Sequence, residues 1–281
     1  MKKILSLMVC VLASAYAFAQ AGSALLIPSD SRALAMGVTS LQPEASTLDA
    51  KAFFGKWAPQ TANNTILGAD AFYRLNDKLA FSLEGRNLKD QPYTVTNSMG
   101  VATGEFTPSD LIISLGASYG ITDQISVGLK AKMLSSTIAP DIKGSAVCFD
   151  LRAGYSTDLF NAGLSLRNVG GKLDYGAGGY ALPASVALDG TAAPISGLIV
   201  ALDAGFLFSG ALTAGLGVEY TVADIVAVRA GYHYGDASKA IPSYASAGIG
   251  AQFAGIHLDA AYLLASDALG GSLMVSLGYA F

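Results

Sequence analysis

Apolar and polar residues alternate with a period of two along most of the chain. In the segment 110–120, every odd-numbered residue is apolar, whereas most even-numbered residues are serine or glycine and Ile112 is an exception. Successive side chains of a β-strand point to opposite faces, so this alternation predicts a strand with one apolar face. The segments 125–133 and 273–281 repeat the pattern.

The alternation recurs at similar spacing from residue 65 onward. The predicted strands are 65–74, 78–87, 110–120, 125–133, 144–156, 158–167, 181–191, 196–207, 211–221, 224–233, 243–253, 255–266 and 273–281. Such strands are typical of a transmembrane antiparallel β-barrel, and a sheet in lipid must close because an open edge finds no water there. Bacterial barrels usually have an even number of strands, so we expect one more within 48–60. The sequence thus predicts an all-β barrel of fourteen strands, with twelve as the alternative.

A tyrosine stands just before several of the expected short turns. In bacterial barrels, short turns lie on the periplasmic side and longer loops lie outside, and aromatic residues form girdles at the membrane boundaries. The longer connections expected here are 88–109, 168–180 and 234–242. The expected girdle consists of Tyr73, Tyr119, Tyr155, Tyr220 and Phe281. The amphipathic last strand, which ends in Phe281, is also similar to the signal that barrel-assembly machinery recognises.

The composition supports a lipid-covered surface. The 281 residues are 52% hydrophobic and only 14% charged, against about 25% charged in ordinary soluble domains. The net charge of −4 argues against a nucleic-acid partner, which would favour a basic surface. The most apolar window, 193–217, is interrupted by Asp203 and by glycines, so it does not predict a membrane-spanning helix.

The first residues have the parts of a secretory signal peptide. Lys2 and Lys3 precede an apolar stretch, and residues 17–19 form a small-x-small cleavage site. We therefore expect a signal peptide at 1–19, a plug or periplasmic segment at 20–62 and an outer-membrane barrel at 63–281, in a Gram-negative bacterium. Cleavage leaves Cys148 as the one cysteine, which excludes an intramolecular disulfide and a cysteine-based metal site.

If the apolar parity faces lipid, the other parity faces the barrel lumen. It carries six acidic and six permanently basic residues, namely Asp70, Glu84, Arg86, Lys130, Lys132, Asp150, Arg152, Arg167, Asp203, Glu219, Arg229 and Asp259. Balanced charges can pair across a narrow barrel, whereas a selective pore favours a ring of one sign. We interpret the set as a polar network that fills the lumen and holds the barrel together, with a substrate path lined by these residues as the alternative.

Patterns that would indicate catalysis are weak. "GASYG" at 116–120 fits a serine-hydrolase motif, but that motif needs a sharp strand-to-helix turn, and Ser118 lies within a regular alternation. His233 and His257 have no metal-binding spacing, and both fall on the luminal parity. No P-loop or dinucleotide-binding fingerprint occurs. The sequence therefore predicts a non-enzymatic protein with no cofactor and no metal site.

The segment 29–59 resembles the plug-region opening of FadL-like barrels and of the PorV/PorQ family. The family pattern, RA-x-x-MG followed by D-A-x-A, matches Arg32, Ala33, Met36 and Gly37 and then Asp49, Ala50 and Ala52. The chain departs from the family at 56–58, where Lys-Trp-Ala replaces Asn-Pro-Ala. The stretch 140–185 is similar to the PorV/PorQ core, including Asn168, Gly170 and the pair Leu182-Pro183. The resemblance implies a FadL-type barrel whose N-terminal segment folds into the lumen.

The resemblance also implies a function. PorV-type proteins are outer-membrane partners in type IX secretion, which favours a scaffold or shuttle in that or related envelope machinery. The alternative is a FadL-like channel for long-chain fatty acids or other hydrophobic solutes; an open porin and a lipid-hydrolysing barrel are weaker hypotheses. The expected partners are outer-membrane lipid, barrel-assembly machinery, secretion or envelope proteins and a hydrophobic ligand. A scaffold would use an extracellular rim with Tyr93, Met99, Phe106 and Tyr234, whereas a channel would need a lateral gap, which we expect at 175–183.

Overall fold

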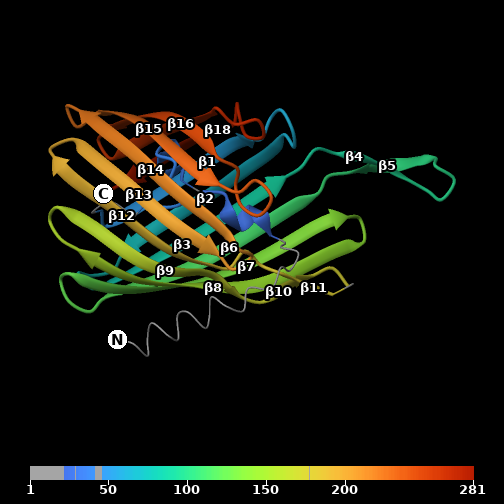
Figure 1. The fold of residues 1–281 in the computed structure, drawn as a ribbon, viewed down its shortest axis with the longest axis horizontal. Coiled ribbons are helices and arrows are strands. Elements are labelled where there is room, and N and C mark those ends of the chain that lie inside the picture. Colours follow the sequence, from blue (N-terminus) through green and yellow to red (C-terminus); the bar gives the residue numbers. More distant parts are fainter. Residues whose placement is uncertain (1–21, 29, 42–45, 177) are drawn as a thin grey trace.

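The computed structural model describes residues 22–28, 30–41, 46–176 and 178–281 (Figure 1). The expected signal peptide at 1–19 lies outside the described residues. Within the described part of the chain, no helix is both long and apolar enough to cross a membrane.

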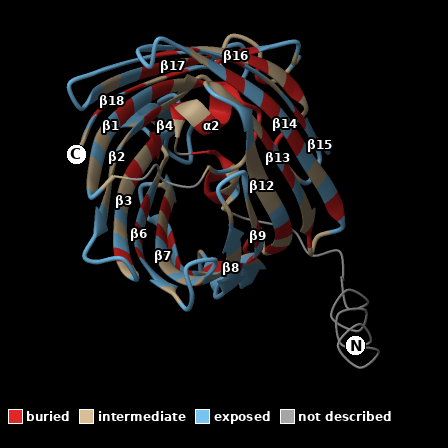
Figure 2. Ribbon diagram, turned by 90° about the vertical axis from the view of Figure 1, so that its left-hand side faces the viewer, coloured by how far each residue is buried: buried red, intermediate tan, exposed pale blue. Residues whose placement is uncertain are grey.

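Fourteen antiparallel strands close into a barrel, which confirms the expected architecture (Figures 1 and 2). They are β1 (Leu48–Trp57), β2 (Asn64–Arg74), β3 (Leu79–Lys89), β6 (Ser109–Gly120), β7 (Ile125–Ala139), β8 (Ile142–Ser156), β9 (Phe160–Gly170), β12 (Ser185–Ile195), β13 (Leu198–Leu207), β14 (Ala211–Val222), β15 (Val226–Gly235), β16 (Tyr244–Phe253), β17 (Ile256–Leu264) and β18 (Leu273–Ala280). Each strand pairs with the next along the chain, and β1 pairs with β18 to close the wall.

The fourteenth strand, β1, lies in the stretch 48–60 where an additional strand was expected. The barrel therefore begins at Leu48 and not at residue 63. The strand is hard to recognise because Phe53 points into the barrel, where it is buried, whereas the outward positions Ala50 and Ala52 are small. Large apolar residues thus occur on both faces of this strand, with Phe54 outward and Phe53 inward, and the usual contrast between the faces is weak.

The barrel has two unlike ends, which we call the short-turn end and the loop end. At the short-turn end, the side chain of Asn76 accepts hydrogen bonds from the backbone N–H groups two and three residues ahead, and Thr122 and Thr157 do the same. Side chains that bond their own turn in this way favour tight turns. The repeated phrases around Tyr73 and Tyr119 are therefore the same turn, built several times with different residues.

Longer connections lie at the loop end. One of them forms the hairpin of β4 (Tyr93–Thr96) and β5 (Ala102–Phe106), which projects well beyond the barrel (Figure 1). The Tyr93 hydroxyl donates a hydrogen bond to the backbone carbonyl of Ile138 at 3.1 Å, which ties the base of the hairpin to β7.

A second connection folds back onto the wall. It contains β10 (Lys172–Asp174) and β11 (Gly179–Ala181); β10 pairs with β8 and with β11, whereas β11 has no second strand partner in the described sheet. Before this hairpin, Asn168 (φ 55°) and Gly170 (φ 148°) take left-handed backbone conformations where the β8–β9 register shifts. The wall strands β8, β9 and β12 are paired beside this hairpin, so the lateral gap expected at 175–183 stays a prediction, and the one edge without a strand partner there is that of β11.

The described N-terminal residues lie inside the barrel, and we call residues 22–28 and 30–41 the luminal segment (Figure 2). It contains the 3₁₀ turn η1 (Ser23–Leu26) and the short helix α2 (Ser31–Ala35). Asp30 is the N-cap of α2, because its carboxylate accepts a hydrogen bond from the Arg32 N–H at 2.7 Å. The short polar cap and the following small residues explain why this segment forms a helix rather than a strand.

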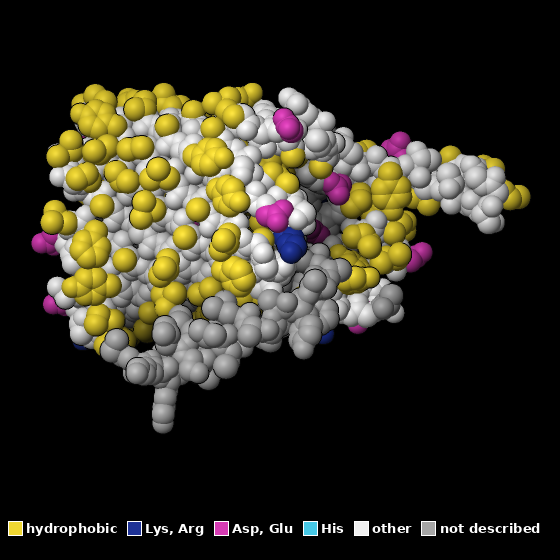
Figure 3. Space-filling view, in the orientation of Figure 1, with side chains coloured by type: hydrophobic (Ala, Val, Ile, Leu, Met, Phe, Trp, Pro, Cys, Tyr) yellow, Lys and Arg dark blue, Asp and Glu magenta, His cyan; other side chains and the backbone are white. Residues whose placement is uncertain are grey.

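The outward face of the wall is covered by large apolar side chains (Figure 3). Leu67, Leu115 and Leu188 are examples from three strands, and all three are exposed. This is the arrangement expected for a surface in contact with lipid. The five girdle residues are also exposed, and their place at a membrane boundary stays a prediction.

Candidate functional site in the barrel lumen

Apolar side chains fill the half of the lumen nearest the loop end. We call this the loop-end core: it surrounds η1 and consists of Ala24, Leu25, Ile27, Leu34, Ala35, Phe53, Trp57, Ala58, Ile66, Leu88, Ile112, Leu134, Ala146, Cys148, Leu173, Leu182, Ile241, Tyr244, Ala261, Leu263, Leu269 and Met274. Gly22 shows how close the contact is, because a Cβ there would lie 2.8 Å from Leu134 and 3.2 Å from Leu182. A polar network was expected throughout the lumen, and in this half the expectation is wrong.

The residues that interrupt the alternation along the strands face this core. Ile112, the exception in the 110–120 segment, is only 1% exposed and points into the loop-end core. Leu134 and Met274 are two more apolar residues at luminal positions. Luminal side chains of this half pack against one another and around η1, so inward positions need to be as apolar as outward ones, and the period of two is lost.

A cavity of about 1400 Å³, which we call the short-turn chamber, occupies the other half of the lumen and extends to Leu207, Ala240 and Ile241 at the loop end. All twelve luminal residues expected from the sequence line it, together with residues of the short turns themselves, such as Gly197, Asp224 and Gly255. The chamber therefore reaches the short-turn rim, and its ceiling is formed by Leu25, Ile27 and their neighbours in η1.

Several luminal charges pair across an intervening glycine. Arg152 on β8 reaches over Gly163 on β9 to Asp189 on β12. A Cβ on Gly163 would collide with the guanidinium, so only glycine lets the arginine lie flat across the strand. The small residues of the luminal face are therefore needed for the ion pairs.

The same geometry recurs on the opposite wall. Arg229 crosses Gly250 to reach Asp259 at 2.6 Å. His257 lies over Gly278 and approaches the Asp49 carboxylate at 3.0 Å. These pairs join strands that share no backbone hydrogen bonds, so they tie the wall together in steps of two strands.

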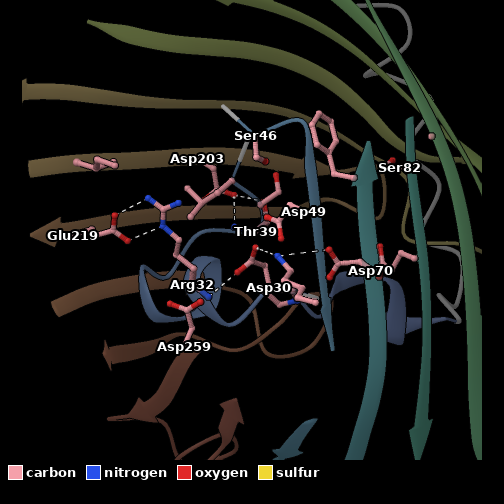
Figure 4. Close-up of a pocket in the computed structure, with 18 of the residues that line it drawn as sticks. Asp30, Arg32, Thr39, Ser46, Asp49, Asp70, Ser82, Asp203, Glu219 and Asp259 are labelled. Carbon is pink, nitrogen blue, oxygen red and sulfur yellow. Dashed lines mark hydrogen bonds and ion pairs between the residues drawn. The ribbon is translucent and has the colours of Figure 1, made fainter. Parts of the chain in front are cut away.

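The luminal segment is held by charged side chains of the wall (Figure 4). Arg86 donates to the carbonyls of Ile27 at 2.5 Å and of Ala24 at 3.1 Å, which fixes η1. Arg32 makes a two-pronged pair with Glu219, at 2.7 and 2.6 Å. Bidentate contacts of this kind are among the strongest polar interactions available to an arginine.

Asp30 anchors the start of α2, and Thr39 anchors the turn that follows this helix. Asp30 contacts Lys51 at 2.6 Å, and Thr39 donates its hydroxyl to Asp203 at 2.5 Å while it accepts from Arg167 at 2.6 Å. Burial would raise the pKa of the Asp30 carboxyl, but the Lys51 ammonium and the hydrogen bonds outweigh burial and hold that pKa at about 2. Asp30 is thus a carboxylate at neutral pH.

Met36 and Gly37 sit against a smooth patch of the wall. Gly217 on β14 and Gly231 on β15 face Met36 so closely that a Cβ on either would collide with it. Gly37 has φ 67° and lies against the backbone of Tyr232, so a side chain there would be both strained and excluded. The RA-x-x-MG motif therefore has a structural reason: its arginine binds Glu219 and its glycine allows the close approach.

Sequence reasoning missed five charged residues of this network, which are Asp30, Arg32, Asp49, Lys51 and Asp189. Asp49 and Lys51 were missed because β1 was assigned to the plug segment. Asp189 could have been found, because it occupies the luminal parity of a predicted strand. Arg32 matched the family pattern, but no pattern in the sequence pointed to its partner Glu219.

The catalytic and metal-binding candidates stay apart. Ser118 lies within the regular strand β6, with no strand-to-helix turn beside it. His233 stacks on Tyr244, with ring centroids 5.0 Å apart, and its neighbour Gly235 leaves room for the ring. Among the described residues, no group of three or more His, Cys, Asp or Glu side chains is placed to hold a metal ion.

Comparisons with known proteins show the fold. No protein-family model matches the sequence, and no curated protein matches it. The Ralstonia pickettii toluene transporter TbuX is similar in structure, with a TM-score of 0.63, 14% identity and coverage of 91% of this chain and 99% of that one. The CymD monoaromatic hydrocarbon channel has a TM-score of 0.64, 13% identity and coverage of 91% and 98%.

A Pseudomonas aeruginosa FadL homologue also matches, with a TM-score of 0.50, 14% identity and coverage of 95% of this chain and 100% of that one. The chain thus has the fold of FadL-type barrels over nearly its whole length. At 13–14% identity, these likenesses extend to the fold alone. They give no support to a specific PorV/PorQ relationship.

Proposed function

We propose that this protein carries small hydrophobic solutes across the outer membrane of a Gram-negative bacterium. The main observation in support of this proposal is the loop-end core, an apolar region inside the barrel that is built around the short turn η1. The fold shared with hydrocarbon transporters agrees with this function. The channel hypothesis, which was the alternative from the sequence, is therefore preferred to secretion.

The loop-end core suits an apolar solute because it already excludes water. Transfer of apolar surface from water into such a region stabilises by about 25 cal/mol per Å². The short-turn chamber holds the charged luminal side chains beside apolar ones such as Ile27 and Ile112, and loss of water from those charges disfavours a hydrocarbon there. We therefore expect the solute to leave the lumen before the chamber, next to the 182–184 connection, where the second edge of β11 has no strand partner in the described sheet.

The experiment is uptake of labelled toluene by cells that express the protein and lack their own hydrocarbon transporters. Leu25→Asp places a carboxylate in the loop-end core on the luminal segment, and we expect it to lower uptake tenfold or more, whereas Leu25→Ala should have a small effect. Lys78→Gln, on an exposed short turn, is the matched control. Heat-dependent gel mobility verifies that each barrel folds. Uptake equal to that of cells without the protein would refute the proposal.

A second candidate function, the secretion scaffold, has one observation in its favour. The β4–β5 hairpin extends beyond the barrel and exposes apolar side chains, with Met99 81% exposed. Mild detergent extraction from the native membrane, followed by mass spectrometry of proteins and lipids, tests it. A stoichiometric protein partner that is lost when 94–105 is replaced by a short turn would favour the scaffold, and a bound apolar ligand would favour transport.

A further inference from the structure

The ion pairs of the short-turn chamber differ in quality. Most are close: Lys51–Asp30, Lys132–Asp150, Arg32–Glu219, Arg229–Glu219 and Arg229–Asp259 all lie at 2.5 to 2.6 Å. The two longest are loose, since Asp70 stands 3.7 Å from Lys51 and Lys130 stands 3.9 Å from Glu84. The loosely paired groups also keep contact with the chamber, because the side chains of Asp70 and Lys130 are 25% and 37% exposed.

Asp70 is only partly neutralised by its neighbour Lys51. Lys51 makes its short contact, at 2.6 Å, with Asp30, so two carboxylates compete for one ammonium. Figure 4 shows Asp30 and Asp70 close to each other within the pocket. The wall formed by β1 and β2 therefore has a surplus of negative charge at this place.

The wall around β7 has the opposite surplus. Glu84 is shared by two cations, Arg86 at 3.4 Å and Lys130 at 3.9 Å. Asp189 is likewise contacted by two guanidinium groups, those of Arg152 and Arg167. Lys130 is therefore the most exposed cation of this wall, on which two basic side chains contact the same carboxylate at both Glu84 and Asp189.

The surface between the two walls carries Glu84 and Arg86 of β3, with Glu84 directly opposite Asp70, together with small residues. Strands β3 and β6 lie between β2 and β7 in the sheet, and they contribute Ser82, Ser114, Gly116 and Ser118 to the chamber. Three strand spacings separate β2 from β7, or roughly 14 Å between backbones, and the side chains of Asp70 and Lys130 span part of that distance. The result is a polar floor with a carboxylate at one side and an ammonium at the other.

We propose that the short-turn chamber binds a small zwitterionic solute, with its cationic group beside Asp70 and its anionic group beside Lys130. A zwitterion neutralises both surpluses at once, and the serine hydroxyls of the floor can hydrogen-bond its middle. Charges that face each other across a cavity with low-dielectric walls also create a field that orients a dipole. The proposed site does not depend on hydrophobic transport, because it uses the half of the lumen that a hydrocarbon avoids.

The experiment measures binding to the purified full barrel in detergent by titration calorimetry at low ionic strength. The probes are 4-aminobutanoate and its singly charged analogues butanoate and butylammonium. We expect 4-aminobutanoate to bind at least tenfold more tightly than either analogue. Raising the salt concentration should weaken binding, since the exposed charges are then screened.

Two variants test the two ends of the proposed site separately. If Asp70 and Lys130 had only a structural role, the variants would not change the binding of the two singly charged probes in opposite ways. Asp70→Asn should weaken 4-aminobutanoate binding about tenfold and abolish butylammonium binding, while butanoate still binds. Lys130→Gln should do the reverse, losing butanoate and keeping butylammonium. Asp77→Asn and Lys78→Gln, which change charges on an exposed short turn, are the matched controls, and heat-dependent gel mobility reports folding.

Three outcomes would overturn the proposal. The first is a zwitterion that binds no better than its singly charged analogues. The second is a mixture of butanoate and butylammonium that gives the same heat of binding as 4-aminobutanoate. That result would indicate that two separate ions occupy the chamber. The third is variants that weaken all three probes alike. None of these outcomes bears on toluene uptake, so failure here and failure of the proposed transport function are distinguishable.

Discussion

The loop-end core and the short-turn chamber are enclosed by the same fourteen strands, yet they use opposite chemistry. A single strand, β6, passes through both: its luminal face carries Ile112 in the core and Ser118 in the chamber. Apolar packing and Arg86 hold η1 in the first region, whereas charge pairs act together with the apolar contacts of Leu34 and Ala35 to hold α2. The wall is therefore not specialised strand by strand. It is specialised by height along the barrel axis.

The largest expected effect comes from placing the same charge at both heights of one strand. Ile112→Asp buries a carboxylate in the loop-end core and should lower the free energy of unfolding by about 4 kcal/mol or more. Ser118→Asp points into the chamber, and it should change stability by less than about 1 kcal/mol. Urea unfolding in detergent, followed by fluorescence of the single tryptophan, Trp57, measures both. Equal effects would mean that the two regions do not differ in polarity.

A second comparison concerns the anchors of the luminal segment. Arg86→Met removes two charge-assisted hydrogen bonds to η1, and we expect a loss of about 3 kcal/mol. Lys130→Gln removes a pair that is 3.9 Å long and partly exposed, so it should cost about 0.5 kcal/mol or less. Hydrogen exchange of the amides in 22–28, read by mass spectrometry, should accelerate in the first variant alone. Unchanged exchange in Arg86→Met would show that apolar contacts suffice to hold η1.

The glycines beneath the ion pairs should also be sensitive. At Gly250, a Cβ would lie 2.6 Å from both Arg229 and Asp259, so Gly250→Ala should cost about 1–2 kcal/mol by forcing the pair apart. Gly85 faces open space, with nothing within 4 Å of its Cβ position, and Gly85→Ala should remain within about 0.5 kcal/mol. The same unfolding assay reports the difference, and a neutral Gly250→Ala would remove the structural reason given for that glycine.

The last comparison concerns a dependence on acid. The pKa of Asp30 is lowered to about 2 in the folded protein, below the value of about 3.9 in an unfolded chain. Its contribution to stability is therefore complete above about pH 4 and is lost as the pH falls toward 2. Amides of α2 should exchange faster over that interval, and Asp30→Asn should remove the dependence. An unaltered acid profile in Asp30→Asn would assign the effect to another carboxyl.

Most of the strands could be predicted because lipid imposes one simple rule on the outer face. Leu115 and Leu188 obey that rule, and it needs no knowledge of any partner. The division of the lumen could not be predicted with the same ease, although Ile112 carried the signal. One apolar residue at a polar position is easily dismissed, and it acquires meaning only when Leu134, Leu263 and others appear at the same height.

The candidate site was predictable in its membership but not in its pairing. Arg152 and Arg229 were placed in the lumen by parity alone, since parity decides which face a residue occupies. Their partners depend on which strands lie two apart in the closed barrel and on where a glycine leaves room. Arg32 and Glu219 are 187 positions apart, and no local pattern connects them.

The luminal segment has a consequence for the order of assembly. Helix α2 lies against β15, β16, β17 and β18, and Ser31 contacts Ser276 through their hydroxyls. Residues near the start of the described chain can thus make these contacts only after strands near its end have formed. Contacts between such distant residues form late, because a long stretch of chain must be ordered first. The wall closes where β1 meets β18, so we expect the segment to take its place together with this seam.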